Sequence, residues 1–315
     1  MVVETLLSRW CLFIDEAQYL IQHIMKYLEA FYGSFIGTLN WTWNSIVFQV
    51  PWYQNYFWGL ILISLLVWSL EIIFPWRKEQ SIFRKDFWLD GFYMFFNFFI
   101  FSIAISGFFK ILEMGFEDVG IGAKSLALID TSAYPMWVQL LIFFIILDFV
   151  QWCTHMMLHR FEIFWRFHKV HHSVKEMGFA AHLRYHWMEN ILYKPLKTFG
   201  VMILGGFEPE QAYIVHFIAI SIGHFNHSNI KITWGPLKYL INNPVMHLYH
   251  HAFTLPEGRY GVNYGISLSL WDYIFGTHYV PEDSGKITLG FAGDDQFPKD
   301  FMGQISSGFK KSKKI

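Results

Sequence analysis

Three short histidine clusters are the residues of this chain best suited to chemistry. They are His155-Met-Met-Leu-His159, His168-Lys-Val-His171-His172 and His247-Leu-Tyr-His250-His251. Residues three and four positions apart share one face of a helix, so the histidines of each cluster are expected to project together. Neutral imidazole binds iron, zinc, copper and nickel. The three clusters, called histidine boxes below, therefore predict metal binding.

The number of imidazoles predicts two metal ions. A zinc site takes three or four protein ligands and a six-coordinate iron rarely takes more than four, so eight donors exceed the capacity of one ion. A further pair stands in His224-Phe-Asn-His227. We expect His227 to be a ninth ligand. His224 lies one helical turn deeper in the predicted membrane hairpin, and it either binds a metal or has no part in metal binding.

Other polar side chains could bind a metal or hold a ligand histidine. His182, His186 and Glu189 are spaced to share one helical face, and we expect them to orient ligand imidazoles by hydrogen bonds, with direct ligation by either histidine as the alternative. Asp148 precedes His155 by seven residues and could anchor a ligand histidine or serve packing. Asp272 is a further candidate of the same kind.

The composition is that of a membrane protein. Hydrophobic residues make up 54% of the chain and charged residues 16%, against a usual charged share of roughly 25%. The net charge of -1 excludes the basic field that a nucleic-acid-binding protein needs. Two cysteines are too few for a disulfide framework or a thiolate zinc site.

Apolar runs predict an all-α membrane bundle. Three runs, at about 56–74, 92–109 and 135–150, approach the roughly 20 residues that cross a bilayer. Two shorter runs, at about 191–207 and 212–224, predict a helical hairpin joined at Glu208-Pro209-Glu210. We expect one integral-membrane domain over 1–315, with an amphipathic or interfacial segment (1–54), membrane helices (55–226), the catalytic histidine-box region (148–280) and a tail (281–315).

Loop charges predict the orientation of the bundle. Arg77, Lys78, Arg84 and Lys85 lie between the first two runs, and positive residues stay in the cytoplasm. Counting the membrane spans that follow this loop places the histidine boxes on the cytoplasmic side. There we expect them to form a cap that binds two metal ions. The ending Lys311-Ser-Lys313-Lys-Ile315 matches a retrieval pattern, which indicates the endoplasmic reticulum in a eukaryote and the inner membrane in a bacterium.

These motifs resemble the fatty acid hydroxylase and sterol desaturase superfamily of membrane-bound di-iron enzymes. The resemblance rests on the three boxes and on Arg184-Tyr-His186-Trp-Met-Glu189, His227-Ser-Asn229, Asn263-Tyr-Gly265 and Trp271-Asp272-Tyr-Ile-Phe275, in family order. Trp187 stands where the family more often has Pro. The resemblance implies two iron ions and O2, and hydroxylation or desaturation of a sterol, a fatty acyl chain or an ether lipid.

The same resemblance implies a separate electron donor. The sequence shows no glycine-rich dinucleotide fingerprint and no fused haem domain, so we expect two electrons per turnover from a reductase with a cytochrome or a ferredoxin-type carrier. Zinc outcompetes ferrous iron for imidazole ligands, so purified protein can hold zinc instead.

Two other functions compete with the oxygenase. A histidine-rich metal transporter or sensor is the alternative, but transporters place their ligands near the bilayer midplane, whereas the boxes here fall at the ends of spans. A membrane metalloprotease is disfavoured, because His155-Met-Met-Leu-His159 lacks the glutamate of the HExxH motif.

Overall fold

Helices make up most of the computed structural model, which describes residues 2–122, 127–202, 204–205, 209–281 and 287–309. The α-helices are α1 (Val2–Ile46), α2 (Tyr56–Ile73), α3 (Phe87–Phe95), α4 (Phe101–Asp118), α6 (Met136–Arg160), α7 (Glu162–His172), α8 (Trp187–Met202), α9 (Pro209–Asn226), α10 (Pro244–His250), α11 (Leu270–Ile274) and α12 (Phe301–Ser307). The shorter elements are the 3-10 turns η1 (Trp52–Gln54), η3 (Phe179–Leu183) and η4 (Gly235–Tyr239), the π-helix η2 (Phe96–Ile100), and the parallel strands β1 (Ile129–Asp130) and β2 (Leu204–Gly205).

Three helical stretches within the described residues are long and apolar enough to cross a membrane. They are Tyr56–Ile73, Phe87–Asp118 and Met136–Arg160. The predicted all-α fold is confirmed, with three candidate spans by length and composition. The third stretch runs further than the apolar pattern indicates and carries the first histidine box. Helices α8 and α9 stand where the shorter hairpin is predicted. Part of its connection, 206–208, lies outside the described residues, and so does the lysine-rich ending Lys311–Ile315.

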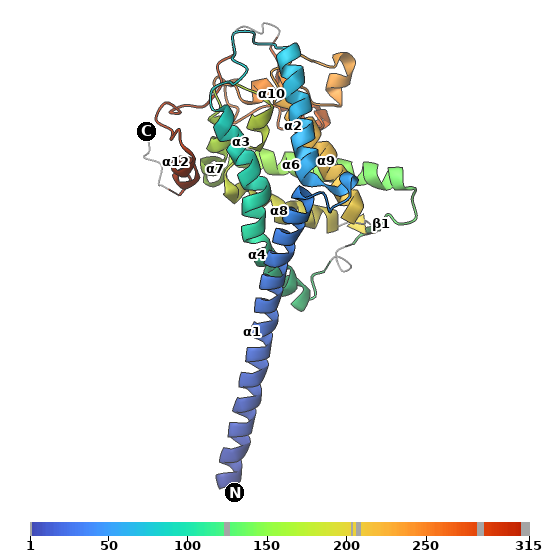
Figure 1. The fold of residues 1–315 in the computed structure, drawn as a ribbon, viewed down its shortest axis with the longest axis vertical. Coiled ribbons are helices and arrows are strands. Elements are labelled where there is room, and N and C mark those ends of the chain that lie inside the picture. Colours follow the sequence, from blue (N-terminus) through green and yellow to red (C-terminus); the bar gives the residue numbers. More distant parts are fainter. Residues whose placement is uncertain (1, 123–126, 203, 206–208, 282–286, 310–315) are drawn as a thin grey trace.

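The N-terminal helix α1 leaves the rest of the molecule as one long rod (Figure 1). Near the body it packs against α4, where Gly107 lets the Phe31 ring and carbonyl approach closely: a Cβ at Gly107 would lie 2.7 Å from both. At the end of α4 the Tyr27 hydroxyl donates to Asp118 at 2.7 Å. Farther out, Phe13 is 63% exposed.

A π-helix interrupts the second span. η2 joins α3 to α4 and faces Asn97 inward, where its amide donates to the carbonyls of Leu183 (3.2 Å) and Tyr185 (2.9 Å). Such wide turns often mark functional sites. Here the turn ties a membrane helix to the segment that follows the second histidine box.

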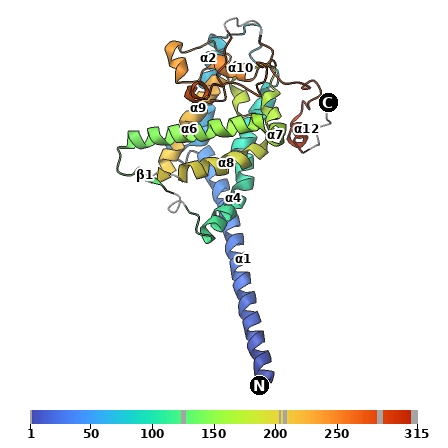
Figure 2. The ribbon, with the colours of Figure 1, turned by 180° about the vertical axis from the view of Figure 1, so that it is seen from behind.

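The C-terminal ends of four helices bring the candidate ligand histidines together. The boxes stand in the last turns of α6, α7 and α10, and His227 directly follows α9. Between α6 and α7 the backbone turns at Phe161, which is extended (φ -106°, ψ 120°). In Figures 1 and 2, α6 and α8 run across the direction of α2 and α4. The C-terminal end of a helix favours cations, so this convergence suits a metal centre.

Candidate metal centre

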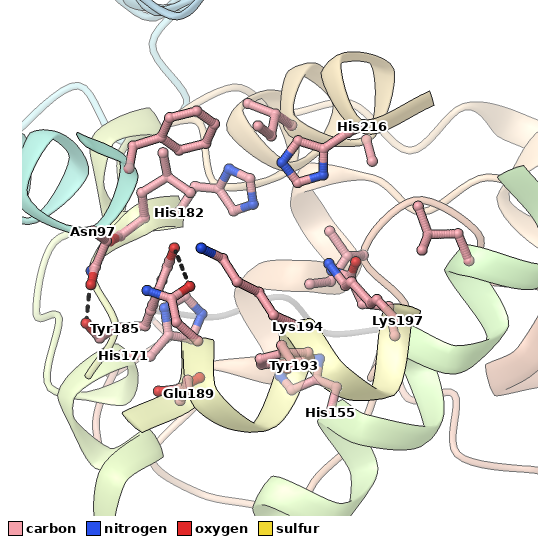
Figure 3. A pocket seen from close by; sticks show the side chains of 18 of the residues that line it. Asn97, His155, His171, His182, Tyr185, Glu189, Tyr193, Lys194, Lys197 and His216 are labelled. Atoms are coloured by element: carbon pink, nitrogen blue, oxygen red, sulfur yellow. Dashed lines mark hydrogen bonds between the residues drawn. The ribbon is translucent and has the colours of Figure 1, made fainter. Parts of the chain in front are cut away.

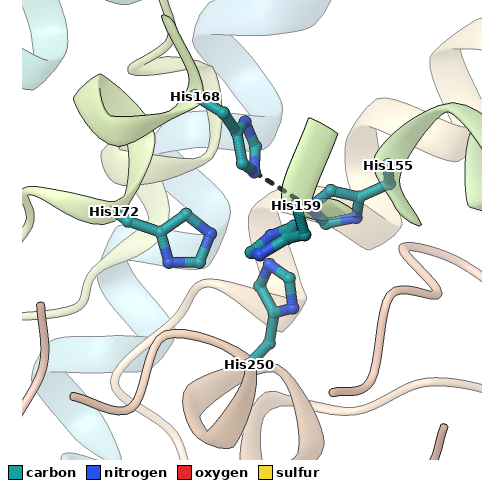
Figure 4. A group of neighbouring side chains, drawn as sticks. All are labelled: His155, His159, His168, His172 and His250. Carbon is teal, nitrogen blue, oxygen red and sulfur yellow. Dashed lines mark hydrogen bonds between the residues drawn. The ribbon is translucent and has the colours of Figure 1, made fainter. Parts of the chain in front are cut away.

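Nine buried histidines form two groups, and within each group the candidate ligand nitrogens lie within 4.8 Å of one another. The first group, site A, contains His155, His159, His168, His172 and His250. The second group, site B, contains His171, His227, His247 and His251. The rings of site A point toward one another from three separate segments (Figure 4). These nine are the residues that the sequence predicts as metal ligands.

Each H-x-x-H-H box contributes histidines to both sites. In α7 the first and last histidines, His168 and His172, face site A, whereas His171 faces site B. The box of α10 is reversed: His247 and His251 face site B, and His250 faces site A. The two sites are consequently adjacent, with the rings of His172 and His251 stacked at 4.4 Å between centroids. The expectation that each of these boxes projects to one point is therefore corrected.

Backbone carbonyls hold four of the ligand rings by their Nδ1 atoms. The pairs are His155 with Tyr264 (2.7 Å), His171 with Arg184 (3.0 Å), His227 with Gly223 (2.7 Å) and His250 with Val262 (2.7 Å). A carbonyl can only accept a hydrogen bond, so each of these Nδ1 atoms carries the proton. The Nε2 atom of each ring is then a bare lone pair that can bind a metal.

Bare nitrogens face each other in both sites. His171 Nε2 and His227 Nε2 lie 3.3 Å apart in site B, and with both protons on Nδ1 neither nitrogen can donate to the other. His155 Nε2 and His168 Nε2 lie 3.2 Å apart in site A, and the same holds when Glu189 is ionised. Nitrogens bound at right angles to one metal at about 2.1 Å stand about 3.0 Å apart.

Several other buried nitrogens lack a hydrogen-bond partner among the described residues. They include the Nε2 atoms of His172 and His250. Burial lowers the pKa of His171 to about 3, and it also lowers the pKa values of His172 and His251. These rings are therefore neutral at pH 7, as ligation requires. Orphaned, neutral nitrogens in two close groups fit a pair of metal ions.

Glu189 holds a ligand ring of site A. Its Oε2 lies 3.1 Å from His168 Nδ1 and accepts from it when Glu189 is ionised; burial raises the pKa of Glu189 to about 8. A carboxylate in this place fixes the tautomer and the ring angle and makes the ligand more basic. The position agrees with the expectation from the sequence that Glu189 orients an imidazole.

His182 and His224 pair with each other outside both sites. Their Nδ1 atoms lie 2.8 Å apart, and His224 Nε2 lies 3.2 Å from the Ser64 hydroxyl. The His182 ring stands 4.9 Å from that of the site B residue His227. Gly223 makes room for it, because a Cβ there would fall 2.2 Å from the His182 ring. The pair therefore packs beside site B.

The prediction that His182, His186 and Glu189 share one helical face is wrong. Residues 179–183 form η3, Arg184 is extended, and α8 begins only at Trp187, so no single helix spans the three. His186 Nε2 instead donates to the Ile305 carbonyl at 2.6 Å. Its ring packs on Phe167 and Phe309. His186 thus supports the C-terminal helix α12.

Asp148 and Asp272 anchor the loop that supplies carbonyl acceptors to the site. Asp148 accepts from the Ser267 and Leu268 amides and from Trp271 Nε1 (3.0–3.3 Å), which corrects the suggestion that it anchors a ligand histidine. Asp272 accepts from the Tyr264 and Gly265 amides, both at 2.8 Å, and from Trp152 Nε1 at 3.0 Å. It thereby fixes the Tyr264 carbonyl that orients His155.

Replacing Asp272 with alanine is expected to lower the free energy of unfolding by about 3 kcal/mol, because it leaves several buried donors without an acceptor. Denaturant unfolding in detergent measures this change. Asp295→Ala is the matched control, since Asp295 is exposed, and it should change stability by less than about 0.5 kcal/mol. Equal effects of the two changes would contradict the anchoring role of Asp272.

A buried ion-pair network was not foreseen from the sequence. Arg184 Nη1 donates to Asp90 (2.9 Å) and Asp86 (3.1 Å), and Arg84 also pairs with Asp90. The network fixes Arg184, whose carbonyl orients His171. Asp90 stands inside an otherwise apolar run, and an ionisable residue in such a run is the signal that could have revealed it.

A cavity of about 330 Å³ opens beside the two sites. Ligand histidines of both sites line it: His155 and His168 of site A, and His171 and His227 of site B. Candidate membrane helices also line the cavity, for example through Tyr56 of α2. Figure 3 shows this cavity with the side chains of α8 along one side. A molecule in the cavity would meet both groups of imidazoles.

Comparison with known proteins places the site within a recognised sequence pattern. Residues 140–277 match the family model for fatty acid hydroxylase. This segment contains all nine histidines, Glu189 and Asp272. No solved structure matches the chain.

Three curated relatives show what the chain is similar to. An ornithine lipid hydroxylase of Rhizobium tropici is 29% identical, with 56% of this chain and 52% of that protein covered. An alkylglycerol monooxygenase of Danio rerio is 28% identical (78% and 52% covered). Methylsterol monooxygenase 1-1 of Arabidopsis thaliana is 27% identical (56% and 54% covered). The chain thus spans about half the length of these relatives.

Proposed function

Since the chain belongs to the fatty acid hydroxylase family over residues 140–277, we propose that it is an integral-membrane, non-haem di-iron oxygenase that hydroxylates or desaturates a membrane lipid. The relatives, named as hydroxylases and monooxygenases of an ornithine lipid, of alkylglycerols and of methylsterols, support a lipid substrate. In this proposal residues 1–315 form one integral-membrane domain with the histidine-box region at 148–280.

The pairs of facing, unprotonated nitrogens carry the proposal. His171 with His227 places lone pairs 3.3 Å apart in buried surroundings, and His155 with His168 does the same at 3.2 Å when Glu189 is ionised. A cation between each pair would convert this repulsion into coordination. We assign the five histidines of site A to one iron and the four of site B to the other.

Bound irons would supply the activation of O2, with two external electrons, that cleaves an unactivated C–H bond. The chain itself positions the reactants. Carbonyl groups hold four ligand rings, Glu189 holds a fifth, and the cavity presents a substrate to both sites. Apolar side chains such as Phe98 and Ile220 line the cavity and would exclude water from it. Hydroxylation and desaturation begin with the same hydrogen abstraction, so both stay within the proposal.

The metal centre is proposed to face the cytoplasm. The positively charged loop after α2 contacts the histidine region: the Trp76 amide donates to the Asn229 carbonyl (2.8 Å), and the Lys85 amide donates to Glu176 (2.7 Å). The loop and the boxes therefore lie at the same end of α2, and positive loops stay cytoplasmic. The membrane would be the endoplasmic reticulum in a eukaryote and the inner membrane in a bacterium. There a separate reductase, with a cytochrome or a ferredoxin-type carrier, would deliver the electrons.

A metal transporter or sensor is the rival function, and the geometry gives it less support. All nine imidazoles are buried, and backbone carbonyls lock four of them. A transported metal ion must leave its site as easily as it enters, whereas imidazole rings held this firmly suit metal ions that stay bound.

Metal analysis and lipid profiling test the proposal together. Protein purified from iron-supplemented cells should contain about two irons per chain, or zinc in their place. Cells that express it should also contain an oxidised lipid that is missing in cells expressing the His155→Ala/His159→Ala variant. One exchangeable ion per chain, combined with identical lipid profiles, would contradict the oxygenase and favour the carrier.

A further inference from the structure

Two uncharged polar groups line the cavity without a hydrogen-bond partner in the described part of the chain. They are the side-chain amide of Gln151 on α6 and the hydroxyl of Tyr193 on α8. Both side chains are half-buried, and the pocket around them is mostly apolar. In ligand pockets of this kind a few polar groups fix the orientation of the ligand. These two groups are therefore available to hold a bound molecule.

Both groups lie about one helical turn from residues of site A. Gln151 precedes the ligand His155 by four residues on α6, so the two side chains share one face of that helix. On α8, Tyr193 follows Glu189 by four residues (Figure 3). Glu189 Oε2 in turn lies 3.1 Å from Nδ1 of the ligand His168. Four residues correspond to about 6 Å along a helix axis, so a molecule held by these groups would lie close to site A.

The helices that carry the two groups pack closely against each other. Gly200 of α8 makes this possible, because a Cβ there would lie 2.6 Å from Cγ2 of Val150 on α6. Val150 is the neighbour of Gln151 in the sequence. The packing thus fixes the cavity faces of α6 and α8 relative to each other, so that one ligand can contact both polar groups.

The two lysines of the cavity wall have interactions of their own. Lys194 donates to the Ser102 hydroxyl at 3.4 Å. Lys197 is attracted electrostatically by the buried carboxylate of Asp148. The cavity therefore does not depend on a charged ligand to engage its lysines, and the groups that await a partner are the uncharged ones.

The two free groups have the same hydrogen-bonding character. The amide of Gln151 offers N–H donors and a carbonyl acceptor, and the hydroxyl of Tyr193 both donates and accepts. A hydroxyl or an amide of a ligand matches both groups, because it also donates and accepts. An ester, an ether or a carboxylate only accepts and would leave the acceptors of the pair without a donor.

We propose that Gln151 and Tyr193 bind an uncharged hydroxyl or amide group of the lipid that the enzyme oxidises. The inference rests on the proposed function and narrows its substrate class to lipids that carry such a group. With this group held one turn from site A, the apolar chain extends along side chains such as Phe98 and Ile220. The oxidised carbon is therefore expected close to the polar group and not at the far end of an acyl chain.

Binding of four lipids with the same hydrocarbon chain tests this proposal without requiring turnover. The radiolabelled probes are oleyl alcohol, oleamide, methyl oleate and oleate, added to the detergent-purified, metal-loaded protein. We expect the alcohol or the amide to bind about tenfold more tightly than methyl oleate and oleate. The tighter of the two distinguishes a hydroxyl from an amide. The Gln151→Leu/Tyr193→Phe variant should bind that probe only as tightly as methyl oleate, with unchanged metal content.

The matched control is Gln49→Leu/Tyr53→Phe, which makes the same two changes at exposed positions outside the cavity and should keep the preference. If the wild-type protein binds methyl oleate or oleate as tightly as the alcohol and the amide, the proposed polar subsite is refuted, even if the cavity variant does not fold. The proposed function would survive that result, because metal content and lipid oxidation are measured separately.

Discussion

Replacing His251 with alanine is expected to lower the metal content from about two ions to about one per chain and to reduce lipid oxidation at least about a hundredfold. His251 belongs to site B, which has four histidines. Its loss leaves three donors in a buried site whose remaining rings stay fixed. A redox-active pair needs both ions, so loss of one should remove nearly all activity.

The matched variant is His172→Ala in site A. The rings of His172 and His251 stack on each other and both are buried, so the two substitutions create similar cavities. Site A has five histidines and keeps four after the change. We therefore expect His172→Ala to retain about two metal ions per chain, as measured by mass spectrometry of the purified protein. Equal metal loss in both variants would contradict the division into sites of five and four donors.

Replacing Glu189 with glutamine is expected to weaken metal binding at site A by about 10- to 100-fold. The amide keeps the size of the side chain and can still accept from His168, but it removes the negative charge that makes this ligand more basic. Competition with a chelator of known affinity measures the loss, which should affect one of the two ions.

The control for this change is Glu162→Gln on α7. Glu162 is exposed, with 64% of its side-chain surface accessible, and its replacement should leave both ions in place. Loss of both ions at once in the Glu189→Gln protein would contradict the assignment of His168 to site A. No change in either affinity would show that the carboxylate only packs there.

The nine clustered histidines could be predicted from the sequence as candidate metal ligands, but their division between two groups could not. In a helix each residue turns by about 100°, so His168 and His172 lie about 40° apart while His171 lies about 100° from His172. These angles show that the rings are neighbours. Which ring belongs to which ion depends on α6, α9 and α10, whose placement is a tertiary property. Similarly, the carbonyls that orient the rings belong to the backbone, and residue type does not reveal them.

The fold shows the same limit. Apolar runs predicted three membrane helices because burial in lipid demands that composition, and helices long and apolar enough to cross a membrane cover all three runs. Hydropathy does not reveal the direction of a helix relative to its neighbours, and α6 runs across the direction of α2 and α4 (Figure 2). His182, His186 and Glu189 do not share a helical face, because the backbone is extended at Arg184, where the spacing suggested a helix. The ion pairs of Arg184 with Asp86 and Asp90 accompany this extended backbone.

The interleaving of ligands in α7 and α10 has a consequence for how the enzyme matures. Neighbouring residues on one turn, His171 with His172 and His250 with His251, face different candidate metal sites. In the proposed di-metal centre, an ion bound at one site would also restrict the turns that carry ligands of the other site, so the entropy lost by these turns would be shared between two binding events. Loading should consequently be cooperative, and protein carrying a single ion should be a minor species during assembly.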